Sequence, residues 1–198
     1  MSFEEDKKKT LKKMCFNDKS DKGSVDEPIK SLLDKINKLE GYYSTSSCSG
    51  RIILIKIPKS GSKKEAEFLY RTHEKAKASE VITVIKKLLN YKDKSVWLRQ
   101  EPAILHVASR TLKDASKLLR IARLIGFKRC GLFEVEKRFI LELMSTEKID
   151  TIIAKDGKVL VSGEYLKVLV DEANKKLART WEKTKKLEEE INKFSTKK

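Results

Sequence analysis

The chain has 198 residues, of which 37% are charged and 39% are hydrophobic, and its formal net charge at pH 7 is +16. This length allows a single domain with a substantial core. The longest apolar runs, such as residues 159–161, are too short to span a membrane, which excludes an integral helical membrane protein. A basic excess of this size favours a polyanionic partner such as RNA, DNA or an acidic membrane surface, although a thermophile's bias can supply part of it.

Three cysteines, Cys15, Cys48 and Cys130, lie far apart in the chain and form no C-x-x-C pair. This spacing argues against a disulfide framework and against a zinc site, and it favours a reducing compartment. Residues 1–13 are polar and rich in lysine, unlike a signal peptide. We therefore expect a cytoplasmic protein that binds no metal. No pattern in the chain indicates its oligomeric state.

The N-terminal part of the chain predicts two helices. Residues 3–15 can form a basic amphipathic helix. Ser24 and Glu27 have the spacing of a capping box, and apolar residues follow at helical spacing until Gly41, which we expect to end the second helix. In this local context Asp26 is a carboxylate in the first turn of a helix, where the helix dipole favours it.

Small and polar side chains dominate residues 42–51, which end in Arg51 and precede an apolar run. We expect a serine-rich loop here, with accessible backbone N–H groups and with hydroxyls that both donate and accept. Arg51 adds a planar guanidinium that suits a carboxylate or a phosphate. Two interpretations fit this composition: an anion-binding loop, or a plain loop that covers the end of a sheet.

The middle of the chain alternates apolar runs with turn residues and helical patterns. The second expected strand carries Arg71 and His73. The expected elements are strands at 51–57, 66–75, 95–99 and 103–109, and a helix that begins at the cap residue Ser79.

The remaining residues predict a capped helix, two hairpins and a long C-terminal helix. Thr111 and Asp114 have capping spacing, and Gly126 closes that helix. Residues 163–194 predict one continuous helix. Beyond Lys183 it is nearly all lysine and glutamate, so we expect this end to project from the body or to lean on a partner. The expected hairpins turn at residues 136–137 and 156–157.

Together these elements predict a mixed α/β fold in a single domain, residues 1–198. We expect a mostly antiparallel or mixed sheet, flanking helices, a basic N-terminal segment at 1–22 and the long C-terminal helix. The eight glycines contain no G-x-G pair. The chain therefore lacks a dinucleotide fingerprint, a P-loop and the glycine-rich turn of the common Rossmann-like methyltransferases.

Nucleophilic chemistry is one possibility for the serine-rich segment. A hydrolase would use Cys48 or a neighbouring serine with a base, and His106 is the best candidate base. However, Cys48 has no G-x-S-x-G-like surroundings, and a lone cysteine is typical of a small core residue. His106 lies in an apolar strand, where a buried histidine held by one backbone bond is the alternative interpretation.

Several motifs occur in order along the chain. The clearest is (S/T)-x-S-S-C-x-G-R at 44–51, and the others are K-G-S-V-D-E at 22–27, E-P-x-x-L-H-V at 101–107, G-F-K at 126–128 and V-x-x-E-Y-L at 161–166. By these motifs the chain resembles archaeal-type members of the tRNA wybutosine-synthesising protein 3 family. Ser109 and residues 129–131 depart from the family's pattern, which often has a cysteine and N-S-G there, so they receive no catalytic role.

The resemblance implies methylation that depends on S-adenosylmethionine in wyosine and wybutosine biosynthesis. The implied acceptor is N4 of 7-[(3-amino-3-carboxypropyl)-4-demethylwyosine], the tricyclic base next to the anticodon of tRNA(Phe). The tRNA(Phe) anticodon arm is then the partner, and lysines and arginines would hold its phosphates. Two alternatives stay open: a non-catalytic RNA-binding module, and a cysteine or serine hydrolase.

The same resemblance implies which residues form the site. Asp26 and His106 would meet at the active centre, where either residue could orient the acceptor base and accept its proton. Of these alternatives we favour Asp26 for orientation and His106 for the proton, because a neutral imidazole titrates near the working pH. Cys48 is expected to pack rather than to react. The residues expected to bind S-adenosylmethionine are Ser44, Ser46, Ser47, Cys48, Gly50 and Arg51.

Overall fold

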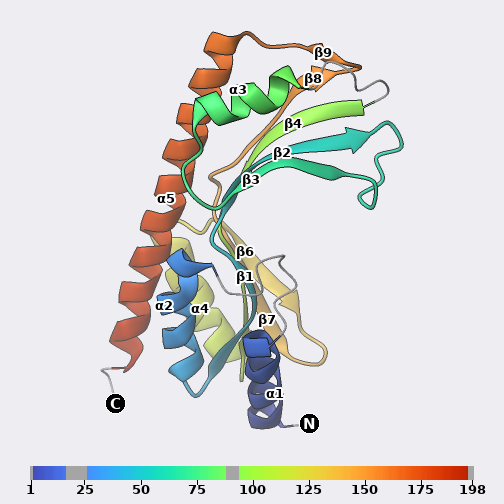
Figure 1. Ribbon diagram of the computed structural model, residues 1–198. Helices are drawn as coiled ribbons and strands as arrows, with labels where there is room; N and C mark the ends of the chain where they lie inside the picture. Colours follow the sequence, from blue (N-terminus) through green and yellow to red (C-terminus); the bar gives the residue numbers. More distant parts are fainter. Residues whose placement is uncertain (1, 17–25, 88–93, 196–198) are drawn as a thin grey trace. The chain divides into compact units, whose positions relative to one another are not determined.

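The computed structural model describes residues 2–16, 26–87 and 94–195 (Figure 1). The chain divides into two compact units that both draw on discontinuous segments. Unit 1 contains Met1–Ser49, Ala103–Thr146 and Thr180–Lys198, and unit 2 contains Gly50–Pro102 and Glu147–Arg179. The assignment of the whole chain to one domain stays a prediction.

Unit 1 is built on an antiparallel sheet that is covered on both faces. Its strands, in spatial order, are β1 (Tyr42–Cys48), β5 (Ile104–Ser109), β7 (Phe139–Met144) and β6 (Arg129–Glu134). The main core joins Leu105 and Leu141 to α2 (Glu27–Lys38), α4 (Leu112–Ile125) and the last part of α5 (Gly163–Ser195). Because side chains alternate along a strand, Ala108 lies on the opposite face, where α1 (Phe3–Phe16) packs.

Unit 2 is built on a second antiparallel sheet. Its strands, in spatial order, are β3 (Glu67–Thr72), β2 (Arg51–Pro58), β4 (Lys94–Glu101), β8 (Ile149–Lys155) and β9 (Lys158–Val159). One face buries Leu54 and Leu98 completely. The helix α3 (Ala78–Lys86) lies on that face. Tyr70 of β3 pairs with Leu54, and its hydroxyl donates to Glu80 of α3 at 3.0 Å.

The predicted fold class is confirmed: the protein is a mixed α/β fold with antiparallel sheets, flanking helices and a long C-terminal helix. The strands form two sheets rather than the one that we expected. Local signals located several elements correctly. The Thr111 hydroxyl accepts from the backbone N–H of Asp114 at 3.1 Å, and Gly126, with a φ of 115°, ends α4.

Two of the predicted boundaries were wrong. Residues 42–48 form strand β1 rather than a loop, because antiparallel pairing with β5 satisfies their backbone groups. The helix α2 ends at Lys38 rather than at Gly41, since Leu39 already has extended dihedral angles. The predicted cap Ser24 lies outside the described residues, and Asp26 occupies the N-cap position.

The predicted exposure of the C-terminal helix was also wrong. Leu187 and Ile191 are buried in the core of unit 1. They lie four residues apart, so they share one face of α5 although charged residues surround them in sequence. On the same part of α5, Glu188 accepts from Ser31 and Lys35 of α2 at 2.7 and 2.5 Å. Burial opposes the ionised form, but these bonds hold the pKa of Glu188 below its ordinary value.

Two further predictions were off by a few residues. Arg71 lies on β3, whereas His73 follows the end of that strand. Ser79 lies inside α3, whose N-cap is Lys77. None of the helices in the described part of the chain is long and apolar enough to cross a bilayer.

Candidate functional site

Strand β1 divides the polar residues of the serine-rich motif between the two faces of the unit 1 sheet. Ser44 pairs with Val107 and Ser47 with Leu105, which places both serines on the core face. Ser46 pairs with His106 on the opposite face. A register shift between Ser44 and Ser46 causes this change, because one extra residue in β1 reverses the alternation.

His106 stands in the middle of a hydrogen-bonded row that crosses three strands. Its Nδ1 lies 2.6 Å from Oγ of Ser46, and its Nε2 lies 2.9 Å from Oε2 of Glu142. A carboxylate can only accept, so Nε2 carries a hydrogen. In a neutral imidazole Nδ1 then accepts from the Ser46 hydroxyl. The row therefore has the order serine, histidine, carboxylate that suits proton transfer.

Phe133 covers part of the His106 ring. The two ring centroids are 5.1 Å apart, with an angle of 33° between the ring planes. Phe133 lies at a register shift in β6, and its side chain is 67% exposed. His106 itself is only partly buried, with a side-chain exposure of 22%. His106 is therefore partly open to solvent, and Phe133 covers one part of its ring.

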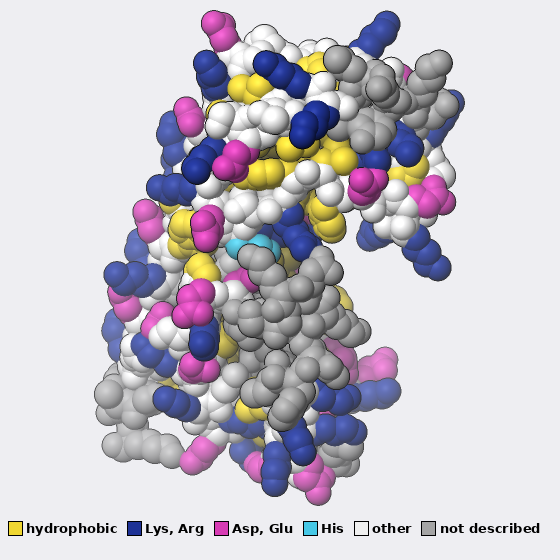
Figure 2. Space-filling view, viewed as in Figure 1, with side chains coloured by type: hydrophobic (Ala, Val, Ile, Leu, Met, Phe, Trp, Pro, Cys, Tyr) yellow, Lys and Arg dark blue, Asp and Glu magenta, His cyan; other side chains and the backbone are white. Residues whose placement is uncertain are grey.

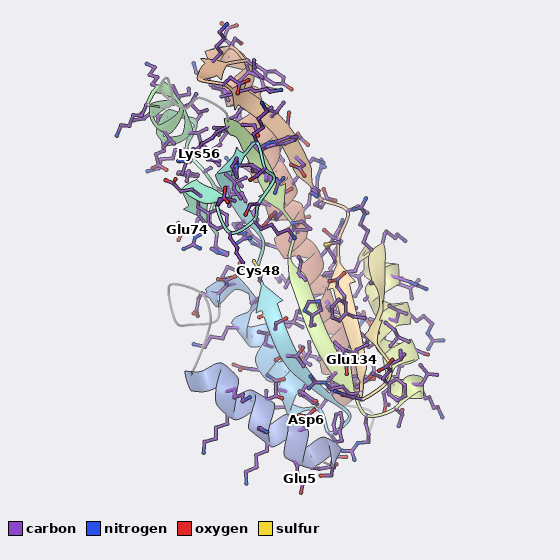
Figure 3. All side chains as sticks on the ribbon, turned by 90° about the vertical axis from the view of Figure 1, so that its right-hand side faces the viewer. Glu5, Asp6, Cys48, Lys56, Glu74 and Glu134 are labelled. Carbon is purple, nitrogen blue, oxygen red and sulfur yellow. The ribbon has the colours of Figure 1, made fainter. Side chains whose placement is uncertain are left out.

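Asp26 holds the end of the same strand. It is the N-cap residue of α2, yet its side chain makes no capping bond to that helix. Its Oδ2 accepts instead from the backbone N–H of the buried Ser49 at 2.8 Å. Asp26 and His106 are distant in sequence, but the fold brings both into contact with residues 46–49. The half-buried Cys48 lies within this segment, at the end of β1 (Figure 3).

Ser44 faces away from this row. Its side chain is fully buried, and both its backbone N–H and its hydroxyl donate to Oδ1 of Asn37 on α2, at 2.7 and 3.1 Å. These bonds fasten β1 to α2. Ser47, also on the core face, is partly buried. Of the predicted serines, Ser46 is the one that touches His106.

The motif's last two residues, Gly50 and Arg51, belong to unit 2. Gly50 has a φ of 93°, which glycine adopts without strain, and its carbonyl accepts from Nδ1 of His73 at 3.0 Å. Nε of Arg51 donates to Oε2 of Glu101 at 2.6 Å. This bond uses one edge of the guanidinium, so recognition of a carboxylate would fall to the two terminal nitrogens.

The sequence analysis did not identify three residues that contact His106 or Arg51, namely Glu142, Phe133 and Glu101. Glu142 and Phe133 gave no motif, although Glu142 is the one acidic residue in the apolar strand 139–144. That isolated charge was the available signal, because an acidic side chain in an apolar strand needs a partner. Glu101 was part of a motif, but its pairing with Arg51 depends on the register between β2 and β4.

A charged cluster fastens α1 beside this site. Asp6 of α1 accepts from the Tyr43 hydroxyl at 2.6 Å and from Arg138 at 2.9 Å (Figure 3). The Tyr43 bond, with help from Arg138, holds the pKa of Asp6 below its ordinary value. Burial raises the pKa of Tyr43. Tyr43 pairs with Ala108, two residues from His106, so α1 packs about 7 Å along β5 from the histidine.

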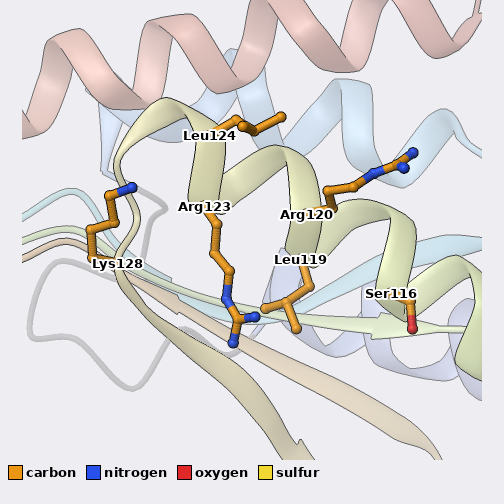
Figure 4. A pocket seen from close by; sticks show the side chains of 6 residues that line it. All are labelled: Ser116, Leu119, Arg120, Arg123, Leu124 and Lys128. Carbon is orange, nitrogen blue, oxygen red and sulfur yellow. The ribbon is translucent and has the colours of Figure 1, made fainter.

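Basic side chains are spread over the visible surface, with acidic ones between them (Figure 2). A hollow of about 410 Å³ lies beside α4, and the charged residues that line it are all basic (Figure 4). Arg123, which lines it, donates to the carbonyl of Cys130 at 3.2 Å. The lining residues are Ser116, Leu119, Arg120, Arg123, Leu124 and Lys128.

Comparisons with known proteins identify relatives of this chain. The family model described as "Methyltransferase TYW3" matches residues 5–193. A protein from Thermococcus sibiricus is 42% identical over 98% of this chain and 96% of its own length. One from Pyrococcus horikoshii is 40% identical over 96% of this chain and 95% of its own. Both carry the name tRNA(Phe) 7-((3-amino-3-carboxypropyl)-4-demethylwyosine(37)-N(4))-methyltransferase, the second with the number 1.

Solved structures show the same fold. The structure of the PH1069 protein from Pyrococcus horikoshii matches with a TM-score of 0.86 and 39% identity, over 96% of each chain. A protein from Aeropyrum pernix matches with a TM-score of 0.73 and 28% identity, over 85% of this chain and 98% of the other. The family model covers nearly the whole sequence, and relatives are about 40% identical along almost their entire length. The chain therefore belongs to the TYW3 methyltransferase family.

Proposed function

We propose that this protein transfers a methyl group from S-adenosylmethionine to N4 of 7-(3-amino-3-carboxypropyl)-4-demethylwyosine in tRNA(Phe). The observation that carries the proposal is the row of Ser46, His106 and Glu142 beside the family motif. N-methylation needs a group that accepts one proton, and this row supplies one. Wyosine chemistry takes place on tRNA, so the compartment that we infer is the cytoplasm.

The chemistry of residues 46–51 fits the methyl donor. S-adenosylmethionine carries a carboxylate, an ammonium and a sulfonium, and it supplies a methyl group for displacement by a nitrogen. The terminal nitrogens of Arg51 suit the carboxylate. The Ser46 hydroxyl donates its hydrogen to His106, so toward the donor it can only accept, which suits the ammonium. Ser47 lies on the opposite face of β1, so we assign it a supporting role. Cys48 and Gly50 would shape the site through packing and backbone conformation. Ser44 keeps a supporting role, because its polar groups bind Asn37.

The proton follows the hydrogen-bonded row. The acceptor nitrogen loses its hydrogen as the new N–C bond forms. Ser46 takes that hydrogen and passes its own to Nδ1 of His106, and the carboxylate of Glu142 stabilises the resulting imidazolium. His106 is thus the base, and Ser46 connects it to the substrate. Glu142 acts through His106 and is a positioning residue.

Asp26 is suited to orient a ligand. Its bond to the Ser49 N–H fixes the carboxylate at the end of β1. A carboxylate held in this way can accept from the edge of the acceptor base or from the donor's ammonium. We assign it the acceptor base. The rate then depends on how well Asp26 and His106 hold the reacting nitrogen in line with the methyl group.

The anticodon arm of tRNA(Phe) is the proposed macromolecular partner. Its phosphates would bind basic side chains, among which the α4 hollow offers Arg120, Arg123 and Lys128 (Figure 4). Such contacts release counterions, so affinity should fall steeply with salt. These contacts carry no sequence information, and the choice of base is left to residues near His106.

The test measures methylation of tRNA(Phe) carrying the precursor base, with mass spectrometry of the modified nucleoside. His106→Asn should slow turnover by about 100-fold or more, because a positioned general base contributes 10²–10⁴ in rate. Asp26→Asn should also slow turnover strongly, while its amide oxygen can still accept from Ser49. Both variants should keep the wild-type melting temperature within a few degrees and bind S-adenosylmethionine in calorimetry.

Methylation at the wild-type rate in both folded variants would contradict the assignment of the site. A protein that binds tRNA but never methylates it would support the RNA-binding module instead. Loss of a hydrolytic activity on treatment with a serine or thiol reagent, without any cofactor, would support the hydrolase.

A further inference from the structure

One face of the unit 2 sheet carries rows of aromatic and basic side chains. Ile55 of β2 pairs with Phe68 on one side and with Trp97 on the other, and Trp97 pairs with Ile152. Paired residues point to the same face, so Phe68, Ile55, Trp97 and Ile152 form one row across four strands. The next row contains Arg71, Ile53 and Arg99 in the same way.

This face is opposite to the one that α3 covers. Leu54 and Tyr70 face α3, and Ile55 is the next residue along β2, so its row points the other way. Phe68 is 45% exposed, and Ile55, Trp97 and Ile152 are only partly buried. A sheet face that presents large aromatic rings to its surroundings calls for a functional explanation.

Arginines lie over both aromatic rings. The guanidinium carbons of Arg51 and Arg71 are 5.4 and 5.5 Å from the centre of the Phe68 ring, and that of Arg99 is 5.7 Å from the Trp97 ring. Carboxylates fix the position of two of them, since Nε of Arg51 binds Glu101 and Nε of Arg99 binds Asp150 at 2.8 Å. The face therefore presents flat rings and flat guanidiniums that are held in place.

Trp97 also borders a hollow of about 410 Å³. Its indole N–H donates to Oγ of Ser95 at 3.0 Å, which fixes the ring against the hollow. Lys59, Lys94 and Lys155 line the same hollow, together with Asp156 as the one acidic group. The hollow thus combines an aromatic wall with a rim that is mainly positive.

From this arrangement the geometry points to a binding surface for single-stranded RNA, made by the Phe68–Trp97 row, its arginines and the three lysines. Unpaired bases stack on aromatic rings and on guanidinium planes, and lysines bind the phosphates between them. Charge complementarity favours a polyanion, and the aromatic row favours one with exposed bases over a duplex. The inference rests on the proposed function, because the unpaired loop of the anticodon arm is the single-stranded RNA in question.

Trp97 provides a direct readout that needs no activity. The protein has two tryptophans, so Trp181→Phe leaves Trp97 as the only indole. Titration with an RNA hairpin that carries the anticodon-loop sequence should quench the Trp97 fluorescence, because a base stacks on the ring. The same stem closed as a blunt duplex without a loop should quench it much less. Unchanged fluorescence at a hairpin concentration that saturates binding would overturn the inference.

Affinity measurements provide a second readout with a matched control. Phe68→Ala and Trp97→Ala should each weaken hairpin binding roughly 5- to 100-fold, the range for loss of one stacked base. Trp97→Phe should keep most of the affinity. Tyr165, at the start of α5, is 47% exposed, much like Phe68, but lies outside these rows, so Tyr165→Ala should leave affinity unchanged. Equal losses in the control and in Phe68→Ala would count against the surface.

The lysines predict a change in salt dependence. Removing Lys59 and Lys155 together should reduce the slope of log K against log salt by about 1.4, since each phosphate contact to a single strand contributes about 0.7. Lys167→Ala with Lys175→Ala, on α5, removes the same charge from another element and should leave the slope unchanged. If quenching and slope behave as expected but no methylation is found, the RNA surface holds and the proposed reaction fails. If methylation is found and these readouts do not change, the surface fails alone.

Discussion

The two sheets differ in how they use their polar side chains. In unit 1, Ser46, His106 and Glu142 bind one another in a row across three strands. In unit 2, Arg51 and Arg99 lie over aromatic rings, and each donates from Nε to a carboxylate. The first arrangement can move a proton, and the second can stack flat ligands. Two antiparallel sheets of similar construction can therefore carry different chemistry, which depends on the residues in each row.

Glu142→Gln tests whether the row of unit 1 is a proton path, and among the four variants that follow it has the largest expected effect. The carboxamide keeps the size of the side chain, but without a negative charge it stabilises an imidazolium much less, so kcat should fall about 100-fold with little change in KM. Steady-state methylation of tRNA(Phe) measures both constants. Glu142→Asp should recover part of the rate. A rise in KM alone would assign Glu142 a purely structural role.

Arg51→Ala tests whether the Arg51–Phe68 pair and the Arg99–Trp97 pair of unit 2 differ in function. Loss of one charged hydrogen bond should weaken S-adenosylmethionine binding by about 1.5 kcal/mol, roughly tenfold. Arg99→Ala is the matched control, because Arg99 also binds a carboxylate and lies over a ring, yet lies outside the motif. Calorimetry should show the loss in the first variant only. Equal affinities in both would remove Arg51 from the donor site.

Cys48→Ser tests whether the thiol takes part in the chemistry. Because His106 binds Ser46 rather than Cys48, the rate should stay within about twofold, with stability lowered by roughly 1 kcal/mol through poorer packing. Methylation assays and denaturant unfolding measure the two effects. Detection of a methyl or RNA adduct on Cys48 by mass spectrometry would establish nucleophilic catalysis instead.

Asp6→Asn tests how α1 is fastened beside the His106 row, and its effect should be the smallest. The folded pKa of Asp6 is lowered, so its stabilisation is complete above the unfolded pKa of about 4 and is lost as pH falls through the folded value. For a partly exposed carboxylate we expect about 0.5 kcal/mol. The variant should be less stable than the wild type at pH 7, and in denaturant unfolding this difference should shrink as the pH falls below about 4. Glu5→Gln on the same helix is the control and should leave the free energy of unfolding unchanged at both neutral and acidic pH.

Much of the fold could be predicted because the signals are local. The capping pair Thr111 and Asp114, the closing Gly126 and the turn at 156–157 depend on residues that are close in sequence. The strand β1 was harder to predict, since serine-rich composition indicates a loop and only pairing with β5 makes it a strand. Burial of Leu187 and Ile191 was missed because the charges around them dominate the composition.

The site could be predicted only in part, because some of its contacts depend on how the strands pair. In the structure Asp26 contacts Ser49 and His106 contacts Ser46, both in the serine-rich segment, whereas their meeting at one active centre and their roles there stay predictions. Glu142 was not found, because its bond to His106 depends on the register between β5 and β7. Local sequence marks Asp26 as a helix start, and the structure shows that its carboxylate instead holds Ser49.

The division of the chain restricts how the protein can be taken apart. Unit 2 contains two separate stretches of sequence and unit 1 contains three, and α5 contributes buried side chains to both, with Val170 in one and Leu187 in the other. No single cut in the backbone therefore releases either unit whole. A truncation before α5 removes core residues from both at once, so a recombination that exchanged one unit between relatives would have to replace several segments together.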